Sequence, residues 1–167
     1  MTPALAVYEI ERNGYTISTD PARLDFDVIH HFLRQSYWSP GIPRNVVERA
    51  ARNSLCFGVY QETAQVGYSR IISDYATFTY LADVFILPEH RGRGLAKWLL
   101  GTIQDHPALQ AIRHWVLFTA DAHSLYAQFG FATDPASADW LMTWRDPAYA
   151  EMVARQGMEH FDDTVEI

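Results

Sequence analysis

The sequence has only one cysteine, Cys56, among its 167 residues. A single cysteine excludes a disulfide within the chain and fits a reducing compartment. Cys56 lies between Leu55 and Phe57 in a strand-like stretch, which predicts a core residue rather than a nucleophile. No apolar run is long enough to cross a bilayer, and the first twenty residues lack the apolar stretch of a signal peptide. We therefore expect a cytoplasmic protein with no membrane partner.

Basic residues are fewer than acidic residues: the chain has 13 Lys and Arg against 20 Asp and Glu, which gives a net charge of -7. Nucleic-acid binding needs surplus cations for the phosphates, so this charge argues against it and is compatible with a cationic small substrate. The seven histidines lack a metal-ligand spacing such as H-E-x-x-H, so no metal site is predicted. We expect the adjacent His30 and His31 to be one buried and one exposed on a helix.

Apolar residues make up 49% of the chain and aromatic residues 14%, which is typical of one folded domain with a sizeable core. Turn and capping signals then divide the chain into strands and helices. We expect a hairpin turning at Asn13-Gly14, helices at 20–36, 44–54, from 95 and at 123–129, strands at 55–60, 66–73, 78–88, 114–119 and 141–145, and a helical piece at 149–157. Asp20 and Pro21 are the expected start of the first helix, and Gly130 is an expected left-handed cap.

The stretch "RGRGLAK" at 91–97 joins an expected strand to an expected helix. The first N–H groups of a helix are unpaired, and Gly92 and Gly94 leave room for an anion to approach them. Arg91, Arg93 and Lys97 add positive charge, so the turn predicts a pyrophosphate site. Neither a P-loop nor a Rossmann fingerprint fits, because Leu95 follows Gly94 and Lys97 replaces a small residue. A plain glycine-rich connection with solvated arginines remains the alternative.

The wider stretch "LADVFILPEHRGRGLAKWLL" resembles the central motif of the GNAT family of N-acetyltransferases, in which Arg91, Gly94 and Ala96 match Arg/Gln-x-x-Gly-x-Gly/Ala. The segment "LYAQFGF" at 125–131 resembles a second family element, and the two occur in the family's order. The resemblance covers residues 8–145 and implies one domain over 1–167 with an extension at 146–167. It implies an α/β fold, an α-β-α sandwich whose mixed, mostly antiparallel sheet is splayed in the middle, the acyl-CoA N-acyltransferase fold.

The same resemblance implies acetyl-CoA as co-substrate and, as acceptor, a primary amine of a small molecule or peptide that attacks the thioester directly. In the family, the strand before the glycine-rich turn carries a bulge and pairs with the pantetheine arm along an open edge. The residues expected to hold acetyl-CoA are therefore Val84, Phe85, Ile86, Arg91, Gly92, Arg93, Gly94, Leu95 and Ala96. The N–H groups of Val84, Phe85 and Ile86, especially that of Ile86, are also expected donors to the thioester carbonyl.

Tyr126 is the residue that the resemblance implies as the acid for the leaving thiolate. Leu125 and Phe129, four residues apart, mark the buried stripe of the short helix, so Tyr126 is turned about 100° away toward a cleft. The alternative is an ordinary packed tyrosine. Asp83 stands among apolar neighbours, where a charge is costly unless paired. Either an arginine such as Arg70 pairs with it, or it faces the acceptor and binds or deprotonates the amine.

Tyr37 and Trp38 lie in the Pro/Gly loop after the first helix, a region that often covers the acceptor in the family; loop anchoring is the alternative. Many members carry an asparagine before the last helix. Here that stretch is "TADAHS", so Thr119, Asp121 or Ser124 would have to replace it, and His123 stands beside them. The rival functions are a non-catalytic acyl-CoA-binding sensor or scaffold domain and a protein lysine or N-terminal acetyltransferase. A homodimer is compatible with the sequence.

Overall fold

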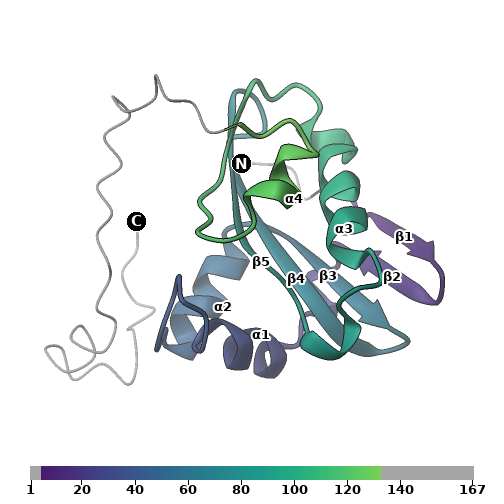
Figure 1. Cartoon of the computed structure of the whole chain (residues 1–167), viewed down its shortest axis with the longest axis vertical. Coiled ribbons are helices and arrows are strands. Elements are labelled where there is room, and N and C mark those ends of the chain that lie inside the picture. Colours follow the sequence, from purple (N-terminus) through teal and green to yellow (C-terminus); the bar gives the residue numbers. More distant parts are fainter. Residues whose placement is uncertain (1–4, 133–167) are drawn as a thin grey trace, which may run out of the picture.

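Six strands form one sheet in chain order in the computed structural model, which describes residues 5–132 (Figure 1). The strands are β1 (Glu9–Arg12), β2 (Tyr15–Ser18), β3 (Leu55–Gln61), β4 (Ala64–Ser73), β5 (Phe78–Ile86) and β6 (His114–Val116). All neighbouring pairs are antiparallel except β5 and β6, which are parallel. The expected mixed, mostly antiparallel sheet is confirmed.

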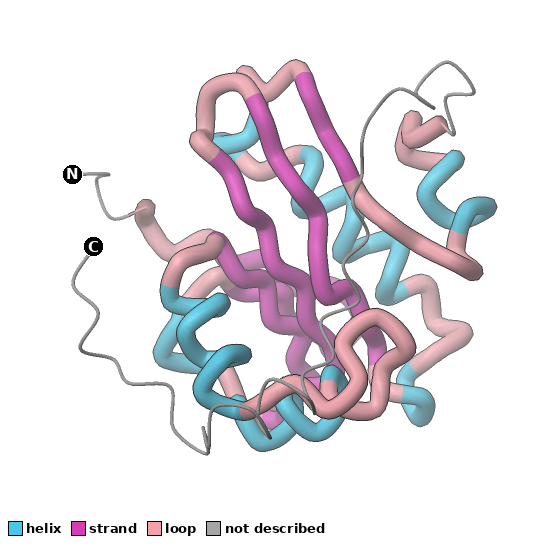
Figure 2. The backbone as a smooth tube through the Cα atoms, turned by 90° about the vertical axis from the view of Figure 1, so that its left-hand side faces the viewer, coloured by secondary structure: helices cyan, strands magenta, loops and turns pink. Residues whose placement is uncertain are grey.

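Helices cover both faces of the sheet, as Figure 2 shows. Four α-helices are described, α1 (Phe26–Leu33), α2 (Arg44–Arg52), α3 (Leu95–Gln104) and α4 (His123–Ala127), with 3-10 turns η1 (Pro21–Arg23), η2 (Pro88–His90) and η3 (Pro107–Leu109). Buried residues of α1 and α2 form one core cluster with Cys56, Tyr68 and Phe85. Those of α3 form a second cluster on the other face, against which α4 packs. The α-β-α sandwich follows from these two cores.

Strand β3 contributes side chains to both core clusters. Side chains of a strand alternate between its faces. Leu55, Phe57 and Val59 accordingly pack toward α3, whereas Cys56 packs toward α1 and α2. Cys56 is 6% exposed, as expected for a core residue, and burial raises the pKa of its thiol to about 11.

The N-terminal hairpin turns at Asn13 and Gly14, as the sequence predicts. Both residues have a positive φ, 52° and 78°. Two consecutive positive φ values define the primed turn whose twist matches that of a two-residue hairpin. The turn sets the register in which Arg12 lies opposite Tyr15.

The first helix begins later than expected. Asp20 caps only the 3-10 turn η1, by accepting a hydrogen bond from the N–H of Ala22 at 2.9 Å. Asp25 caps α1 instead and accepts from the N–H groups of Asp27 and Val28. The physical reason is that Ile29 and Leu33, the buried stripe of the helix, begin one turn after Asp25.

Strand β5 carries a bulge that moves its second half. Arg70 pairs with Ala82 and Tyr68 with Phe85, so one residue of β4 faces two residues of β5, Asp83 and Val84. Asp83 has a φ of 56°, the left-handed conformation found at such extra residues.

The sheet opens beside this bulge. β6 pairs only with residues 78–80 of β5, so the expected strand 114–119 is too long, because residues 117–119 leave the ladder. β5 also ends at Ile86, before the expected Pro88, which opens the 3-10 turn η2. The second half of β5 therefore borders an open edge, which is the expected splay.

The expected strand at 141–145 and the helical piece at 149–157 lie outside the described residues. Within residues 5–132, no helix combines the length and apolar character needed to cross a membrane.

Candidate functional site

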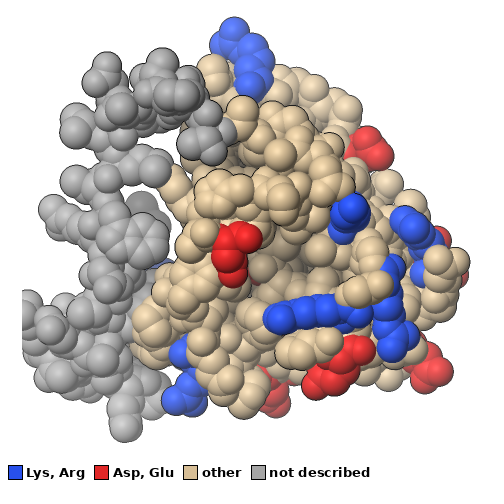
Figure 3. Space-filling view, in the orientation of Figure 1, with Lys and Arg blue, Asp and Glu red and all other residues tan. Residues whose placement is uncertain are grey.

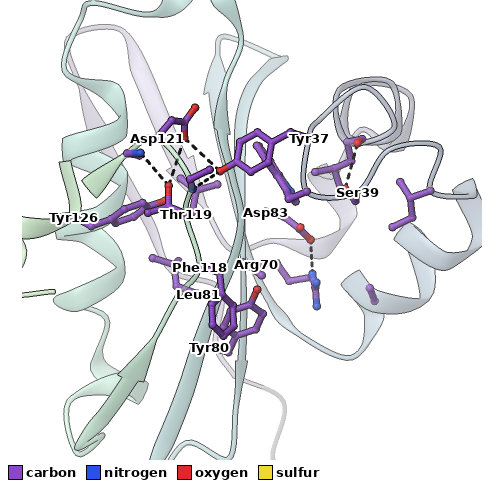
Figure 4. Close-up of a pocket in the computed structure, with 18 of the residues that line it drawn as sticks. Tyr37, Ser39, Arg70, Tyr80, Leu81, Asp83, Phe118, Thr119, Asp121 and Tyr126 are labelled. Atoms are coloured by element: carbon purple, nitrogen blue, oxygen red, sulfur yellow. Dashed lines mark hydrogen bonds and ion pairs between the residues drawn. The ribbon is translucent and has the colours of Figure 1, made fainter. Parts of the chain in front are cut away.

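A cavity of about 480 Å³ lies where the sheet opens. Figure 4 shows its walls, which are β5 with Asp83, the loop after α1 with Tyr37, and the segment after β6 with Thr119 and Asp121. Tyr126 of α4 closes one side. Three stretches far apart in the sequence thus meet at the bulge of β5.

An ion pair forms part of the lining on the sheet side. Arg70 Nε donates to Asp83 Oδ2 at 2.8 Å, and Arg70 Nη1 donates to Ser54 Oγ at 3.3 Å. The side chains of Arg70 and Asp83 are 15% and 14% exposed. Burial opposes the charge of Arg70, but the attraction of Asp83 and its hydrogen bond together raise the pKa of Arg70. Asp83 is therefore paired with Arg70 and also borders the cavity, so the two expectations for it are compatible.

Tyr126 borders the cavity from α4, with its ring 5.9 Å from that of Phe131. Leu125 and Phe129 pack against the α3 core, as the helical spacing predicts. Burial, together with the nearby Tyr37 and Asp121, raises the pKa of the Tyr126 phenol to about 12. The hydroxyl is consequently protonated at neutral pH and available as a donor.

Tyr37 connects the two walls of the cavity (Figure 4). Its hydroxyl accepts a hydrogen bond from the N–H of Ala120 at 2.9 Å and donates to Asp121 Oδ1 at 3.3 Å. Trp38 stacks edge-on against Tyr37 at 5.0 Å, and its buried Nε1 has no partner among residues 5–132. Both residues line the cavity, so the structure places them beside Tyr126 and Asp83.

Two aromatic residues of the cavity, Tyr80 and Phe118, are not predicted from the sequence. Their rings lie 5.5 Å apart, Tyr80 on β5 and Phe118 on the segment that leaves the sheet after β6. Tyr80 stands three residues before Asp83, a spacing that puts two strand residues on opposite faces. The bulge at Asp83 brings both to one cavity, and the only signal was an aromatic residue within the pattern "FTYLAD".

The backbone of β5 presents alternate N–H groups to the open edge. The N–H of Leu87 donates to the carbonyl of Val66 on β4 at 2.8 Å. In the antiparallel pattern the N–H of Ile86 then points away from β4, as does that of Val84, while that of Phe85 points toward β4. Ile86 and Val84 thus fit the expectation of free donors at this edge, and the N–H of Phe85 does not.

The turn before α3 lies just beyond the end of this strand. Gly92 and Gly94 have φ values of 74° and 78°, and no atom lies within 4 Å of where a Cβ would stand. The first N–H groups of α3, from Leu95 onward, have no partner within the helix. Arg91 is held to the strand, because its Nε donates to the carbonyl of Ile86 at 2.9 Å.

Positive charge gathers near this turn. Arg91, Arg93 and Lys97 are exposed, whereas Leu95 is buried and offers only its backbone. Figure 3 shows Lys and Arg side chains grouped at the lower right, the side on which Figure 1 places the beginning of α3. An open backbone with nearby cations suits a phosphate-bearing ligand.

Of the other residues considered in the sequence, some line the cavity and others lie away from it. Thr119 and Asp121 line the cavity, whereas Ser124 and His123 do not. His30 is half-buried against the carbonyl of Ile42 and His31 is exposed. Among residues 5–132, no three His, Cys, Asp or Glu side chains are grouped closely enough to hold a metal ion.

Comparison with known proteins places the same region in one family. Residues 52–133 match the family described as Acetyltransferase (GNAT) domain. A protein of Gibberella zeae, FG08082, named as a proposed acetyltransferase, is 36% identical in an alignment 140 positions long that covers 70% of this chain and 78% of its own.

Similar solved structures support the same family assignment. A crystal structure from Xanthomonas campestris, named as a proposed acetyltransferase of the GNAT family, is 46% identical with a TM-score of 0.78 and matches 84% of this chain and 99% of its own. A proposed acetyltransferase of Clostridium acetobutylicum, solved with acetyl-CoA, is 15% identical with a TM-score of 0.53, over 66% of this chain and 82% of its own. The second likeness shows the fold alone.

Proposed function

Because this chain belongs to the GNAT acetyltransferase family, we propose that it moves an acetyl group from acetyl-CoA to a primary amine by direct attack. The observation that carries the proposal is the cavity at the open edge of β5. Asp83 and Tyr126 both face it, and the turn before α3 follows the same strand. Strand β5 carries Asp83 at the cavity and leads into the turn proposed to bind phosphate, while Tyr126 faces the same cavity from α4.

The residues present suit acetyl-CoA. The backbone N–H groups of residues 92–96 bind the pyrophosphate in this proposal, because Gly92 and Gly94 have no side chains that would block its approach. The pantetheine arm is to follow the open edge of β5, where the N–H groups of Val84 and Ile86 point. Acetyl-CoA supplies the thioester whose carbonyl carbon the amine attacks. The N–H of Ile86 stabilises the charge that develops on the carbonyl oxygen.

In the reaction, the N–C bond forms, the C–S bond breaks, the amine gives up a proton and the departing sulfur gains one. Exchange with solvent then returns the acid and the base to their starting protonation states. Asp83 is the group to bind the ammonium or to take its proton, directly or through water, because its carboxylate is held at the cavity by Arg70. Tyr126 is the group to donate a proton to the departing thiolate, because burial keeps its phenol protonated.

The test is a screen for thiol release from acetyl-CoA with monoamines, polyamines, amino acids, aminoglycosides and peptides. We expect CoA release in step with a product that is heavier by one acetyl group, detected by mass spectrometry. Tight CoA binding with no acetylated product from any amine would instead identify a sensor without turnover.

A further inference from the structure

The hydroxyl of Tyr37 joins two segments that are far apart in the sequence (Figure 4). Tyr37 is 50% exposed, yet its hydroxyl accepts a hydrogen bond from the N–H of Ala120 at 2.9 Å and donates to Asp121 Oδ1 at 3.3 Å. Tyr37 lies in the loop between α1 and α2, whereas Ala120 and Asp121 lie between β6 and α4. The two hydrogen bonds therefore hold one wall of the cavity against another.

The segment that Tyr37 binds is the turn that begins α4. Thr119 Oγ1 donates to Asp121 Oδ1 at 3.5 Å and accepts a hydrogen bond from the N–H of Ala122 at 3.0 Å. Ala122 is the N-cap residue of α4, and its carbonyl accepts a hydrogen bond from the N–H of Tyr126 at 3.2 Å. A continuous series of hydrogen bonds therefore leads from the loop after α1 to the backbone of Tyr126.

Helix α4 depends on support from outside the helix. It has only 5 residues, far fewer than an isolated helix needs to be stable. Ala122 at its N-cap has no polar side chain that could accept from the first N–H groups of the helix. Packing of Leu125 and Phe129 against the α3 core fixes the buried side of α4, but Tyr126 is turned about 100° away from Leu125 and faces the cavity. The orientation of Tyr126 therefore also depends on the turn at which the helix begins.

We propose that Tyr37 is a positioning residue, which holds the turn before α4 so that the hydroxyl of Tyr126 stays at the cavity. This inference rests on the proposed function, in which Tyr126 protonates the departing thiolate. Proton donation requires the phenol to lie within hydrogen-bond reach of the sulfur, about 3 Å, and a small displacement of a reacting group costs much of the rate. Tyr37 acts on the rate only through Tyr126, because it is not the donor itself.

The experiment is a double-mutant cycle on kcat, with saturating acetyl-CoA and the best acceptor found in the thiol-release screen. Tyr37→Phe removes the hydroxyl and keeps the ring, which contacts Trp38 edge-on at 5.0 Å. We expect kcat to fall about tenfold, while KM for the acceptor and CoA affinity stay within about twofold of the wild type. When Tyr37→Phe is combined with Tyr126→Phe, it should cause no further loss of kcat, because no donor is left to position.

The control is Tyr75→Phe, at a half-buried tyrosine that does not line the cavity, and it should leave kcat unchanged in both backgrounds. Because Tyr37 is exposed, we expect an unaltered melting temperature for Tyr37→Phe, which excludes misfolding as the cause of a lower kcat.

The outcomes separate this inference from the proposed function. An unchanged kcat for Tyr37→Phe, or a change confined to KM, overturns the inference. An equal loss of kcat with and without the Tyr126 hydroxyl also overturns it, because Tyr37 would then act on the substrates directly. A kcat for Tyr126→Phe equal to that of the wild type overturns it as well, since there would be no acid to position. All of these leave acetyl transfer standing, whereas absence of CoA release with every amine overturns both.

Discussion

Asp83 Oδ2 accepts a hydrogen bond from Arg70 Nε at 2.8 Å, and the pair holds the one extra residue of the β5 bulge in place. Asp83 has a φ of 56°, which is uncommon for a residue other than glycine. The ion pair explains how a charged side chain is kept in this conformation at 14% exposure. It also leaves the carboxylate at the cavity, where the proposed reaction uses it.

We expect a variant that lacks only one partner of the ion pair to be less stable than a variant that lacks both. Arg70→Gln or Asp83→Asn leaves a mostly buried charge unpaired, which should destabilise the fold by about 3 kcal/mol. For a chain of this size that lowers the melting temperature by roughly 6 to 12 °C. The double variant removes both charges and should recover much of the loss, as thermal unfolding will show.

Turnover in the double variant separates the two roles of Asp83. If the carboxylate acts on the amine, the double variant regains stability but stays at least about tenfold slow, since a lost acid–base group cannot be replaced by the amide. A double variant with restored turnover would reduce Asp83 to a structural partner of Arg70. Single variants as stable as the wild type would contradict the importance of the pair.

Tyr126→Phe removes the proposed donor and keeps the ring. Because the pKa of this phenol is raised to about 12, the group is protonated throughout the working pH range. We expect kcat to fall about 10²-fold, as for other lost general acids, with CoA affinity and melting temperature unchanged.

The comparison uses the best acceptor found in the screen. Tyr75→Phe serves as control, because Tyr75 is half-buried but does not line the cavity. A kcat for Tyr126→Phe close to that of the wild type would remove Tyr126 from the mechanism.

Stability should also fall in mildly acidic solution because of His106. This residue is 4% exposed, its Nδ1 accepts a hydrogen bond from the N–H of Ala108, and burial lowers its pKa below the ordinary 6.5. As the pH falls through about 6.5, the unfolded chain takes up a proton that the folded chain does not, so folding loses free energy.

The variant His106→Asn keeps an acceptor for Ala108 and removes the titration. Melting temperatures measured from about pH 7.5 down to pH 5.5 should fall less steeply in the variant than in the wild type. Parallel curves for the two proteins would show that His106 does not contribute to acid sensitivity.

Local patterns were enough to predict most of the fold. The core position of Cys56 in β3 and the spacing of Leu125 and Phe129 in α4 are confirmed, because each depends on contacts within the element and with the layers packed against it. The start of α1 was misplaced because Asp20-Pro21 and Asp25 are both good local starts, and the position of Ile29 against the sheet decides between them.

The site was less accessible to sequence reasoning. The family resemblance implied a bulge in β5 but not its position, because that depends on how Arg70 and Tyr68 of the neighbouring strand pair with β5. Tyr80 and Phe118 were missed for the same reason, since their meeting requires the sheet to open after Val116. Tyr126, Asp83, Tyr37 and Trp38 were found because chemistry or family resemblance singled them out one by one.

The most direct test of the account is the dissociation constant of CoA for the variant Gly94→Glu, measured by calorimetry. A side chain and a negative charge at Gly94 would stand where the pyrophosphate is to lie, so affinity should fall at least tenfold, about 1.4 kcal/mol. Gly41→Glu is the matched control, because Gly41 also has a positive φ, 74°, and open space around its Cβ position, but lies in the loop between α1 and α2. We predict equal CoA affinity for the wild type and for Gly41→Glu and an at least tenfold weaker affinity for Gly94→Glu. Equal CoA affinity in all three proteins, or no affinity in the wild type, would contradict the account.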